Sequence, residues 1–238
     1  MKILLTNDDG INSKGINILE KLLSNYGEVY VVAPSDGKSG ASSSLTIYKY
    51  FEVNKIDDHH YAVCGTPADC TIVGLNAIGQ KFDLVVSGCN NGYNLSFDCI
   101  YSGTLGACFQ ALVQKAKTIA FSADYNKFDD IYENAKMAFD YILDNDLASN
   151  EYMLNVNFPL GHFGVAKDIL ITKQFVREIK YEIKTDGNMI MPIRQITNEC
   201  DSLEYDVFAI DNGYTSITPL NMTRFDKNTY NKLIKKVK

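Results

Sequence analysis

The sequence predicts an α/β protein built on a parallel, doubly wound sheet. From the N-terminus to about residue 125, short β-branched or aliphatic runs alternate with segments of helical periodicity. After Asp146 the pattern becomes mostly β. We therefore expect a core over residues 1–146 that carries the functional loops. Residues 147–238 should supply the remaining core strands, a projecting hairpin and a terminal helix, within one composite domain.

The first half of the chain contains four strands and four helices in this prediction. The strands are short runs rich in Val, Ile and Leu, and each is followed by a polar loop. The helices repeat apolar residues every three or four positions, as expected of elements that cover a sheet face. We expect strands at residues 3–6, 29–33, 84–87 and 118–122, and helices at residues 16–24, 68–77, 106–115 and 129–143.

The C-terminal part should form strands at residues 153–158, 168–173 and 214–219. Residues 176–184 and 189–196 alternate like the two arms of a hairpin, and residues 227–238 read as a basic amphipathic helix. A hairpin and helix that project from a compact sheet predict contacts in a homodimer or homotetramer. A lid folded back on its own chain would give the same pattern.

Charge and composition narrow the partner classes. The chain has 238 residues, 46% of them hydrophobic and 22% charged, which is typical of a globular protein. The net charge is −6 and the arginines are Arg177, Arg194 and Arg224, so no basic face is predicted for polymeric nucleic acid. A small phosphate ester remains compatible, because a metal ion and backbone N–H groups can hold phosphate without arginine.

Location and redox state are also expectations from the sequence. The first eight residues turn acidic too early for a signal peptide, and no apolar run reaches membrane-spanning length. We expect a cytoplasmic protein without a membrane partner. The cysteines form no CxxC pair and lie in or beside apolar stretches, so buried free thiols are expected; they are Cys64, Cys70, Cys89, Cys99, Cys108 and Cys200.

Asn7-Asp8-Asp9-Gly10 directly follows the first predicted strand and places two adjacent carboxylates at its end. In open α/β sheets this is where ligands bind. Two neighbouring acids repel and lose hydration unless a cation or proton lies between them, so a hard divalent metal accounts for the pair. An Asx-rich turn that caps the helix beginning near Lys14 accounts for the same residues.

The loop of residues 36–44 follows the second strand and is rich in serine. Its Gly37-Lys38-Ser39 resembles the end of a P-loop, but Val32 occupies the position where that motif requires glycine. Ser39 is either a metal ligand through its hydroxyl oxygen or part of a flexible turn. A P-loop is therefore excluded, while an oxygen ligand is not.

Two further polar segments follow. Residues 87–94 contain Asn90, Asn91 and Asn94, whose amides suit a hard cation or a phosphate oxygen, although asparagine is equally a turn residue. Tyr101-Ser102-Gly103-Thr104 precedes a predicted helix, where free N–H groups and two hydroxyls can receive an anion. Ordinary capping by Ser102 or Thr104 explains the same residues.

These segments should meet at one edge of the sheet, because the carboxyl ends of parallel strands lie on the same side. Two carboxylates, a serine and an asparagine are an oxygen-rich set suited to Mg²⁺ or Mn²⁺. Next to a helix N-terminus, such a set favours metal-assisted phosphoryl transfer. Other phosphatase chemistries lack their motifs, since the sequence has no Cys-x₅-Arg loop, no Arg-His-Gly nucleophile and no Asp-x-Asp pair after the first strand.

Other residues favour structural roles. Gly65-Thr66-Pro67-Ala68-Asp69 is a typical helix start, and Tyr48, Tyr50 and Phe51 are expected to pack in the core rather than to stack a base. His59 and His60 are expected in a polar loop, and none of the three histidines, His162 included, has metal-ligand spacing. We expect surface or scaffold roles for all three.

The ordered motifs resemble those of the SurE (survival protein E) nucleotidases over nearly the whole length. The matching segments are Leu4-Leu5-Thr6-Asn7-Asp8-Asp9-Gly10, Val32-Ala33-Pro34 with Ser39-Gly40-Ala41-Ser42, Gly65-Thr66-Pro67-Ala68-Asp69-Cys70, Val86-Ser87-Gly88-Cys89-Asn90-Asn91-Gly92, Tyr101-Ser102-Gly103-Thr104 and Tyr214-Thr215-Ser216-Ile217-Thr218-Pro219-Leu220. The resemblance implies a Rossmann-like core, a C-terminal segment exchanged between subunits, and hydrolysis of nucleoside 5′- and 3′-monophosphates with one divalent metal per active site.

Carried over by position, the resemblance implies a metal site and a phosphate site. Asp8 and Asp9 would be catalytic and would bind the metal together with Ser39 and Asn90. The phosphate contacts would be Gly40, Asn94, Ser102, Gly103 and Thr104. Asp8 could orient or deprotonate the attacking water, and direct attack by a carboxylate is equally compatible with the sequence.

The chain departs from the family pattern at three places. Ser96 replaces a usual glycine, Gln110-Ala111 replaces Glu-Gly, and residues 183–196 lack the usual glycine- and arginine-rich stretch. These departures concern loop shape, substrate preference and subunit contacts. Two other functions are compatible with the same loops, namely a phosphatase acting mainly on short polyphosphate and a non-catalytic nucleotide or phosphate sensor.

Overall fold

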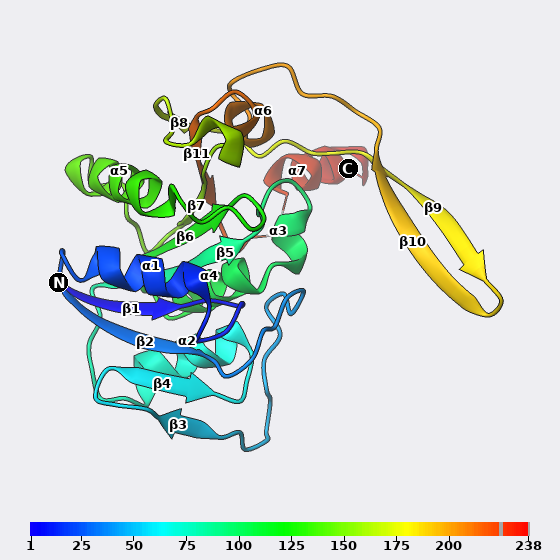
Figure 1. The fold of residues 1–238 in the computed structure, drawn as a ribbon. Coiled ribbons are helices and arrows are strands. Elements are labelled where there is room, and N and C mark those ends of the chain that lie inside the picture. The colour runs from blue at the N-terminus through cyan, green and yellow to red at the C-terminus, as the bar shows by residue number, and fades with distance from the viewer. Residues whose placement is uncertain (224–225, 238) are drawn as a thin grey trace.

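A mostly parallel sheet forms the centre of the protein (Figure 1). The computed structural model describes residues 1–223 and 226–237. Within these ranges the main sheet has nine strands in the order β3-β4-β2-β1-β5-β6-β7-β11-β8. Their bounds are β1 Lys2–Thr6, β2 Glu28–Pro34, β3 Val53–Lys55, β4 His60–Val63, β5 Leu84–Asn91, β6 Thr118–Ala123, β7 Met153–Asn157, β8 Ile169–Ile171 and β11 Thr215–Leu220.

The strands from β4 to β7 pair in parallel, whereas β3 is antiparallel to β4 and β11 is antiparallel to β7. β8 pairs with β11 in parallel. Strands β7, β8 and β11, which lie beyond Asp146 in the chain, thus extend the same sheet as the earlier strands. The predicted α/β fold is confirmed.

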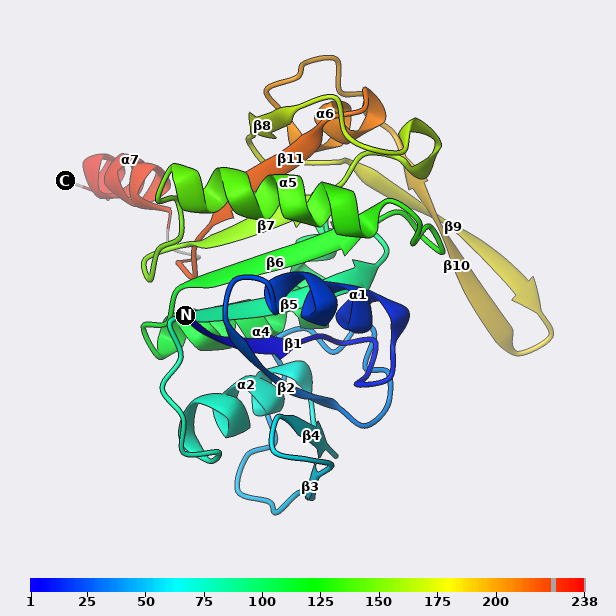
Figure 2. The ribbon, with the colours of Figure 1, turned by 60° about the vertical axis from the view of Figure 1, so that its left-hand side comes forward.

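Helices cover both faces of the sheet (Figure 2). α1 (Lys14–Leu23) and α5 (Ile131–Asp144) share one core with Ile3 and Leu5 of β1. α2 (Pro67–Asn76) and α4 (Gly103–Val113) lie on the opposite face, where α2 packs against Leu4. Alternate residues of β1 therefore enter different cores, which explains why the strand is apolar throughout.

The packing of α1 against β5 is very close. A Cβ atom on Gly15 would lie 2.0 Å from the carbonyl oxygen of Cys89, so only glycine allows this approach. The contact brings the start of α1 directly onto the end of β5. The two loops that precede α1 and follow β5 are thereby held together.

All eight elements predicted for the first half are present, with shifted boundaries. β5 continues to Asn91 instead of ending at Ser87, because its pairing with β6 resumes after a register shift between Ser87 and Asn90. α4 begins at Gly103 rather than near Gly106. Short elements without a clear apolar period were missed, namely β3, β4, α3 (Asp98–Tyr101), the 3₁₀ turn Gly161–Phe163 and α6 (Asp206–Asp211).

The predicted C-terminal hairpin and helix are also present. β9 (Ile179–Asp186) and β10 (Met189–Ile196) form a separate two-stranded sheet that projects from the body (Figure 1). At its base, the Arg194 guanidinium bonds Asp98 at 2.7 Å and lies 4.5 Å from the Phe97 ring centroid. α7 (Lys227–Val237) closes the described chain, and Lys238 of the predicted helix lies outside the described residues.

Two burial predictions need correction. Tyr48 and Tyr50 are completely exposed instead of packing in the core, and only Phe51 contacts the cluster around Leu4. All six cysteines are free as predicted, but Cys64 is exposed and Cys200 is half-buried. Among the described residues, no helix is long and apolar enough to span a membrane.

The histidines occupy surface positions, with one change from the expectation. His60 begins β4 rather than lying in a loop, and its ring contacts Glu20 and Asp57, both at 2.8 Å. Burial of the ring lowers its pKa, but the two carboxylates outweigh that effect and leave the pKa raised. This cluster lies at the amino end of β4, away from the carboxyl edge of the sheet.

Candidate metal and phosphate site

The turn after β1 presents two carboxylates because asparagine makes the turn. The Asn7 amide donates to the Gly10 carbonyl at 3.0 Å and to Ser13 Oγ at 2.8 Å, while Gly10 N–H donates to Asn7 Oδ1. The α1 helix receives no side-chain cap. The Asx turn is therefore real, but it uses Asn7 and leaves Asp8 and Asp9 for another role.

Asp8 is 4% exposed and lies against the start of α4. The Thr104 hydroxyl donates to Asp8 Oδ1 at 2.5 Å. Burial raises the pKa of Asp8 to about 6; the hydrogen bond from Thr104 opposes this shift and the charge of Asp9 adds to it. Asp8 is thus a buried carboxylate held in place by a helix N-terminus.

Asp9 is half-buried beside the end of β5. The backbone N–H of Asn91 donates to Asp9 Oδ2 at 2.9 Å. Burial raises the pKa of Asp9, and the Asn91 N–H partly counteracts it. No Lys, Arg or His among the described residues forms an ion pair with Asp8 or Asp9. Two adjacent shielded carboxylates without a cationic side chain fit a divalent cation.

The other two predicted metal ligands lie on neighbouring segments. Asn90 is half-buried at the end of β5, and its amide Nδ2 donates to the Gly92 carbonyl at 2.8 Å, which leaves Oδ1 without a hydrogen bond to a described residue. Ser39 is exposed in the loop after β2. That loop is tied to the site through Lys38 N–H, which donates to the Asp8 carbonyl at 2.7 Å.

The described residues contain no group of three His, Cys, Asp or Glu side chains arranged for a metal. This is compatible with the predicted set, which contains only two such side chains and completes the coordination with Ser39 and Asn90. Oxygen donors of this kind match Mg²⁺ or Mn²⁺ better than zinc.

The start of α4 forms the phosphate side of the site. Ser102 caps the helix, because its Oγ accepts from Leu105 N–H at 3.1 Å. Gly103 and Thr104 form the first turn, and a Cβ atom on Gly103 would lie 2.8 Å from Asp8 Cβ. The first N–H groups of α4 therefore lie immediately beside Asp8, where a helix N-terminus favours negative charge.

The other two predicted phosphate contacts, Gly40 and Asn94, do not lie at the start of α4. Gly40 is exposed in the loop after β2, with no heavy atom outside its chain neighbours within 4 Å of a Cβ at that position. Asn94 is buried, and its amide donates to Ser122 Oγ at 2.9 Å while its N–H donates to Asn157 Oδ1 at 3.0 Å. Gly40 thus lies in an open part of its loop, whereas Asn94 is bound to residues of β6 and β7.

Two asparagines of β7 bond the backbone of Asn94, a contact that the sequence did not predict. Asn155 Nδ2 and Asn157 Nδ2 both donate to the Asn94 carbonyl, at 2.8 and 3.3 Å. They tie the loop between β5 and α3 to β7. Their signal in the sequence is the pair of asparagines two positions apart in an otherwise apolar strand, an unusual pattern for a buried strand.

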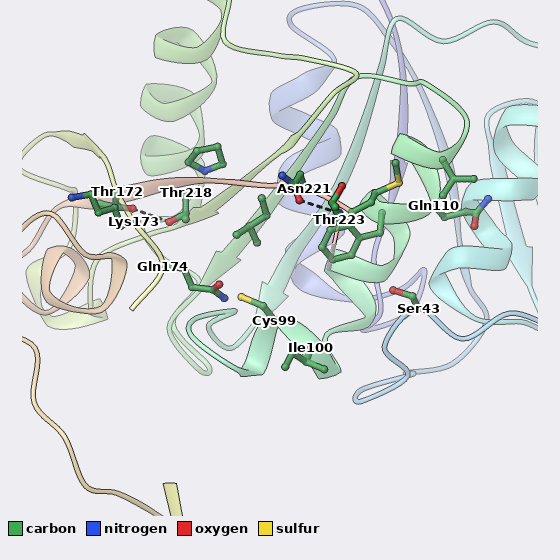
Figure 3. A pocket seen from close by; sticks show the side chains of 15 residues that line it. Ser43, Cys99, Ile100, Gln110, Thr172, Lys173, Gln174, Thr218, Asn221 and Thr223 are labelled. Atoms are coloured by element: carbon green, nitrogen blue, oxygen red, sulfur yellow. Dashed lines mark hydrogen bonds between the residues drawn. The ribbon is translucent and has the colours of Figure 1, made fainter. Parts of the chain in front are cut away.

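A large cavity lies elsewhere, between α3, the last turns of α4 and the end of β11 (Figure 3). It measures about 700 Å³, and Ile100, Phe109, Val113 and Leu220 contribute apolar walls. Lys173 is the one charged group among its described lining residues, and Glu204 pairs with it at 2.8 Å. The cavity thus offers neither a carboxylate cluster nor a free cation, and it is not the metal or phosphate site.

The fold and site together define a doubly wound α/β protein. Its site lies at the carboxyl edge of the parallel strands, where two carboxylates meet the N-terminus of a helix. The family model described as "Survival protein SurE" matches residues 3–181. The chain belongs to the SurE family, and the resemblance inferred from its motifs is confirmed.

Individual relatives agree with this assignment. The chain is 37% identical to a protein named 5′-nucleotidase SurE from Clostridium botulinum (strain 657), over 97% of this chain and 96% of that protein. It is 40% identical to a 5′/3′-nucleotidase SurE from Wigglesworthia glossinidia brevipalpis, over 92% and 91%. The crystal structure of the SurE protein from Aquifex aeolicus superposes with a TM-score of 0.84 and 34% identity, covering 98% of both chains.

Proposed function

We propose that this protein hydrolyses nucleoside 5′- and 3′-monophosphates to nucleoside and phosphate with one Mg²⁺ or Mn²⁺ per subunit. The observation that carries the proposal is the pair Asp8 and Asp9, two shielded adjacent carboxylates with no ion pair among the described residues, directly beside the start of α4. The names of the relatives, 5′-nucleotidase and 5′/3′-nucleotidase, support the substrate class.

In this proposal Asp8, Asp9, Ser39 and Asn90 hold the cation, which supplies charge stabilisation to a phosphate oxygen. Phosphoryl transfer spreads negative charge over the equatorial oxygens of the phosphate. The backbone N–H groups at Gly103 and Thr104 and the hydroxyl of Ser102 would receive those oxygens, because the helix N-terminus is preorganised for an anion.

Gly40 and Asn94 complete the proposed phosphate contacts with unequal support. Gly40 has no side chain, and no heavy atom outside its chain neighbours lies close to the position that a Cβ would take, so a phosphate could approach its backbone N–H without obstruction. Asn94 already donates to Ser122, so a direct contact needs the second hydrogen of its amide. In the proposal Asp8 either orients and deprotonates the attacking water or attacks as a carboxylate.

The test is phosphate release from AMP, GMP and their 3′ isomers, first with EDTA and then with Mg²⁺ or Mn²⁺ restored. We expect turnover that requires the metal and is lost in Asp8→Asn. Faster turnover on short polyphosphate than on any nucleotide would move the assignment to a polyphosphatase. Calorimetric binding of a nucleotide without any phosphate release would indicate a sensor.

We further propose a homodimer or homotetramer assembled through the C-terminal extension. The hairpin exposes Ile183, Met189 and Ile190, and α7 exposes Leu233 and Ile234, all of them apolar side chains that a single chain leaves in water. The cavity of about 700 Å³ beside β11 has partly apolar walls that could receive such a segment from a second copy.

Sedimentation at micromolar concentration tests the assembly. We expect a dimer or larger species, and a monomer would refute it. A cytoplasmic location is part of the same proposal, because the substrates are metabolites; a fractionation experiment that recovers the protein outside the cytoplasm would exclude it.

A further inference from the structure

Asn91 lies at the last position of β5, where it follows one proposed metal ligand, Asn90, and bonds another, Asp9. Its backbone N–H donates to Asp9 Oδ2 at 2.9 Å, and the preceding residue is Asn90. The orientation of one peptide unit, between residues 90 and 91, therefore affects both Asp9 and Asn90. β5 is again paired with β6 here, Asn90 with Ser122 and Asn91 with Ala123, after its register shift. The Asn91 N–H nevertheless donates to Asp9, so its orientation bears directly on that carboxylate.

The side chain of Asn91 is clamped by a residue of the next loop. Asn91 Oδ1 accepts from the Asn126 backbone N–H at 2.7 Å, and Asn91 Nδ2 donates to Asn126 Oδ1 at 3.2 Å. A backbone N–H can only donate, so the orientation of the Asn91 amide is determined by its partner. The two bonds together hold the side chain at both of its polar ends.

The far side of the clamp is itself anchored. Asn126 has a φ of +58°, a left-handed conformation that asparagine tolerates better than most residues. Asp124 accepts from Gly161 N–H at 2.9 Å, which ties the turn to the segment after β7. Gly92 N–H donates to the Ala123 carbonyl at 3.0 Å, so the two loops also meet through their backbones.

We infer that Asn91 and Asn126 are positioning residues that orient Asp9 and Asn90 for the divalent cation. This inference rests on the proposed function. Neither residue is in the proposed ligand set, and the Asn126 side chain acts on Asp9 only through Asn91. Hydrogen-bond partners behind metal ligands of this kind commonly change metal affinity by about 10- to 100-fold when they are removed.

Two variants separate the parts of the clamp. Asn126→Gly removes the Oδ1 acceptor but keeps the backbone N–H donor and accommodates the positive φ without strain. Asn91→Ala removes both side-chain bonds. Asn126→Asp restores an acceptor for Asn91 Nδ2 and serves as the conservative rescue.

The first readout is Mn²⁺ affinity, measured by calorimetry on the full chain after EDTA treatment. We expect affinity to fall about threefold in Asn126→Gly, which loses one hydrogen bond, and at least about tenfold in Asn91→Ala. Asn126→Asp should restore the Mn²⁺ affinity of the wild type. A second readout is hydrogen exchange of the residue 91 N–H in the metal-free protein, which should be faster in Asn126→Gly.

Asn145→Ala is the matched control. The Asn145 amide also bonds a neighbouring carbonyl, Tyr141 O at 2.9 Å, but it lies at the C-terminal end of α5. It should change stability slightly and leave Mn²⁺ affinity unchanged. Wild-type affinity in both clamp variants would overturn the inference while leaving the proposed function intact. Absence of Mn²⁺ and Mg²⁺ binding and of phosphate release in the wild type would overturn both.

Discussion

Gly103→Ala is the most direct perturbation of the contact between α4 and Asp8. The added Cβ would lie 2.8 Å from Asp8 Cβ, 3.0 Å from Asp8 Oδ2 and 3.1 Å from Pro67 Cγ. A separation below 3.0 Å from Asp8 Cβ cannot be relieved by rotating the end of a flexible side chain. Either α4 moves away from β1 or Asp8 leaves its position.

The expected cost follows from overpacking a buried site, which is typically about 1–3 kcal/mol. Alanine is the better helix former and recovers up to about 1 kcal/mol. We therefore expect the free energy of unfolding to fall by about 1–2 kcal/mol in the metal-free protein. For a chain of this size each kcal/mol lowers the melting temperature by about 2–4 °C.

The assay combines chemical denaturation in EDTA with calorimetric titration of Mn²⁺. Because the methyl group displaces a proposed ligand, Mn²⁺ affinity should fall at least about tenfold. Gly37→Ala is the matched control, since its Cβ would meet only the Asp9 carbonyl, at an ordinary 3.7 Å. Unchanged stability and unchanged Mn²⁺ affinity in Gly103→Ala would refute the argument that Gly103 sets the position of Asp8.

Three other predictions concern the site and the segment between β2 and β3. The Asp8 pKa of about 6 lies above its ordinary 3.8, so protonation of Asp8 favours the folded metal-free state. In EDTA, the free energy of unfolding should therefore decrease as pH rises from about 4 to about 7. The expected decrease is about 3 kcal/mol, at 1.36 kcal/mol per unit of pKa shift. Mn²⁺ affinity should rise over the same range, because a metal ligand must be deprotonated; pH-independent affinity between 4 and 7 would contradict this. Ser102→Ala removes the cap of α4 and should cost about 1 kcal/mol in urea denaturation and raise the KM for AMP, whereas an unchanged KM would remove Ser102 from the phosphate contacts. Tyr48→Ala and Tyr50→Ala should each change the free energy of unfolding by less than about 0.5 kcal/mol, because both rings are exposed. Phe51→Ala should lower it by at least about 1 kcal/mol. Equal melting temperatures for all three variants would contradict the packing of Phe51.

The predictions from sequence succeeded where a local pattern had one structural solution. The apolar run before Asp8 forms the predicted buried strand, and Thr66–Pro67 forms the predicted start of α2, where the structure adds a capping box with Asp69. They failed where the pattern was short or interrupted. β5 passes through Gly88 and its register shift to reach Asn91, and no local signal distinguishes that continuation from a loop.

The burial of isolated aromatic residues could not be predicted from the sequence either. Tyr48 and Tyr50 are aromatic residues of a kind that often packs in a core, yet the chain between β2 and β3 runs over the surface and leaves both exposed to water. Phe51, one position further, contacts the core. The difference depends on the path of an irregular segment, which is fixed by distant bonds such as those from Thr46 to Asp69.

By itself, the sequence determined the class of fold, the family and the types of residue available for chemistry, because strand and helix periodicities and ordered motifs are local properties of the chain. Only the tertiary structure decided which of those residues meet. It placed Thr104 and Gly103 against Asp8 and the Asn91 N–H against Asp9, and it engaged the Asn94 amide with Ser122. Such contacts join segments up to 96 positions apart, and they depend on the sheet order and on the close packing of helices that brings the segments together.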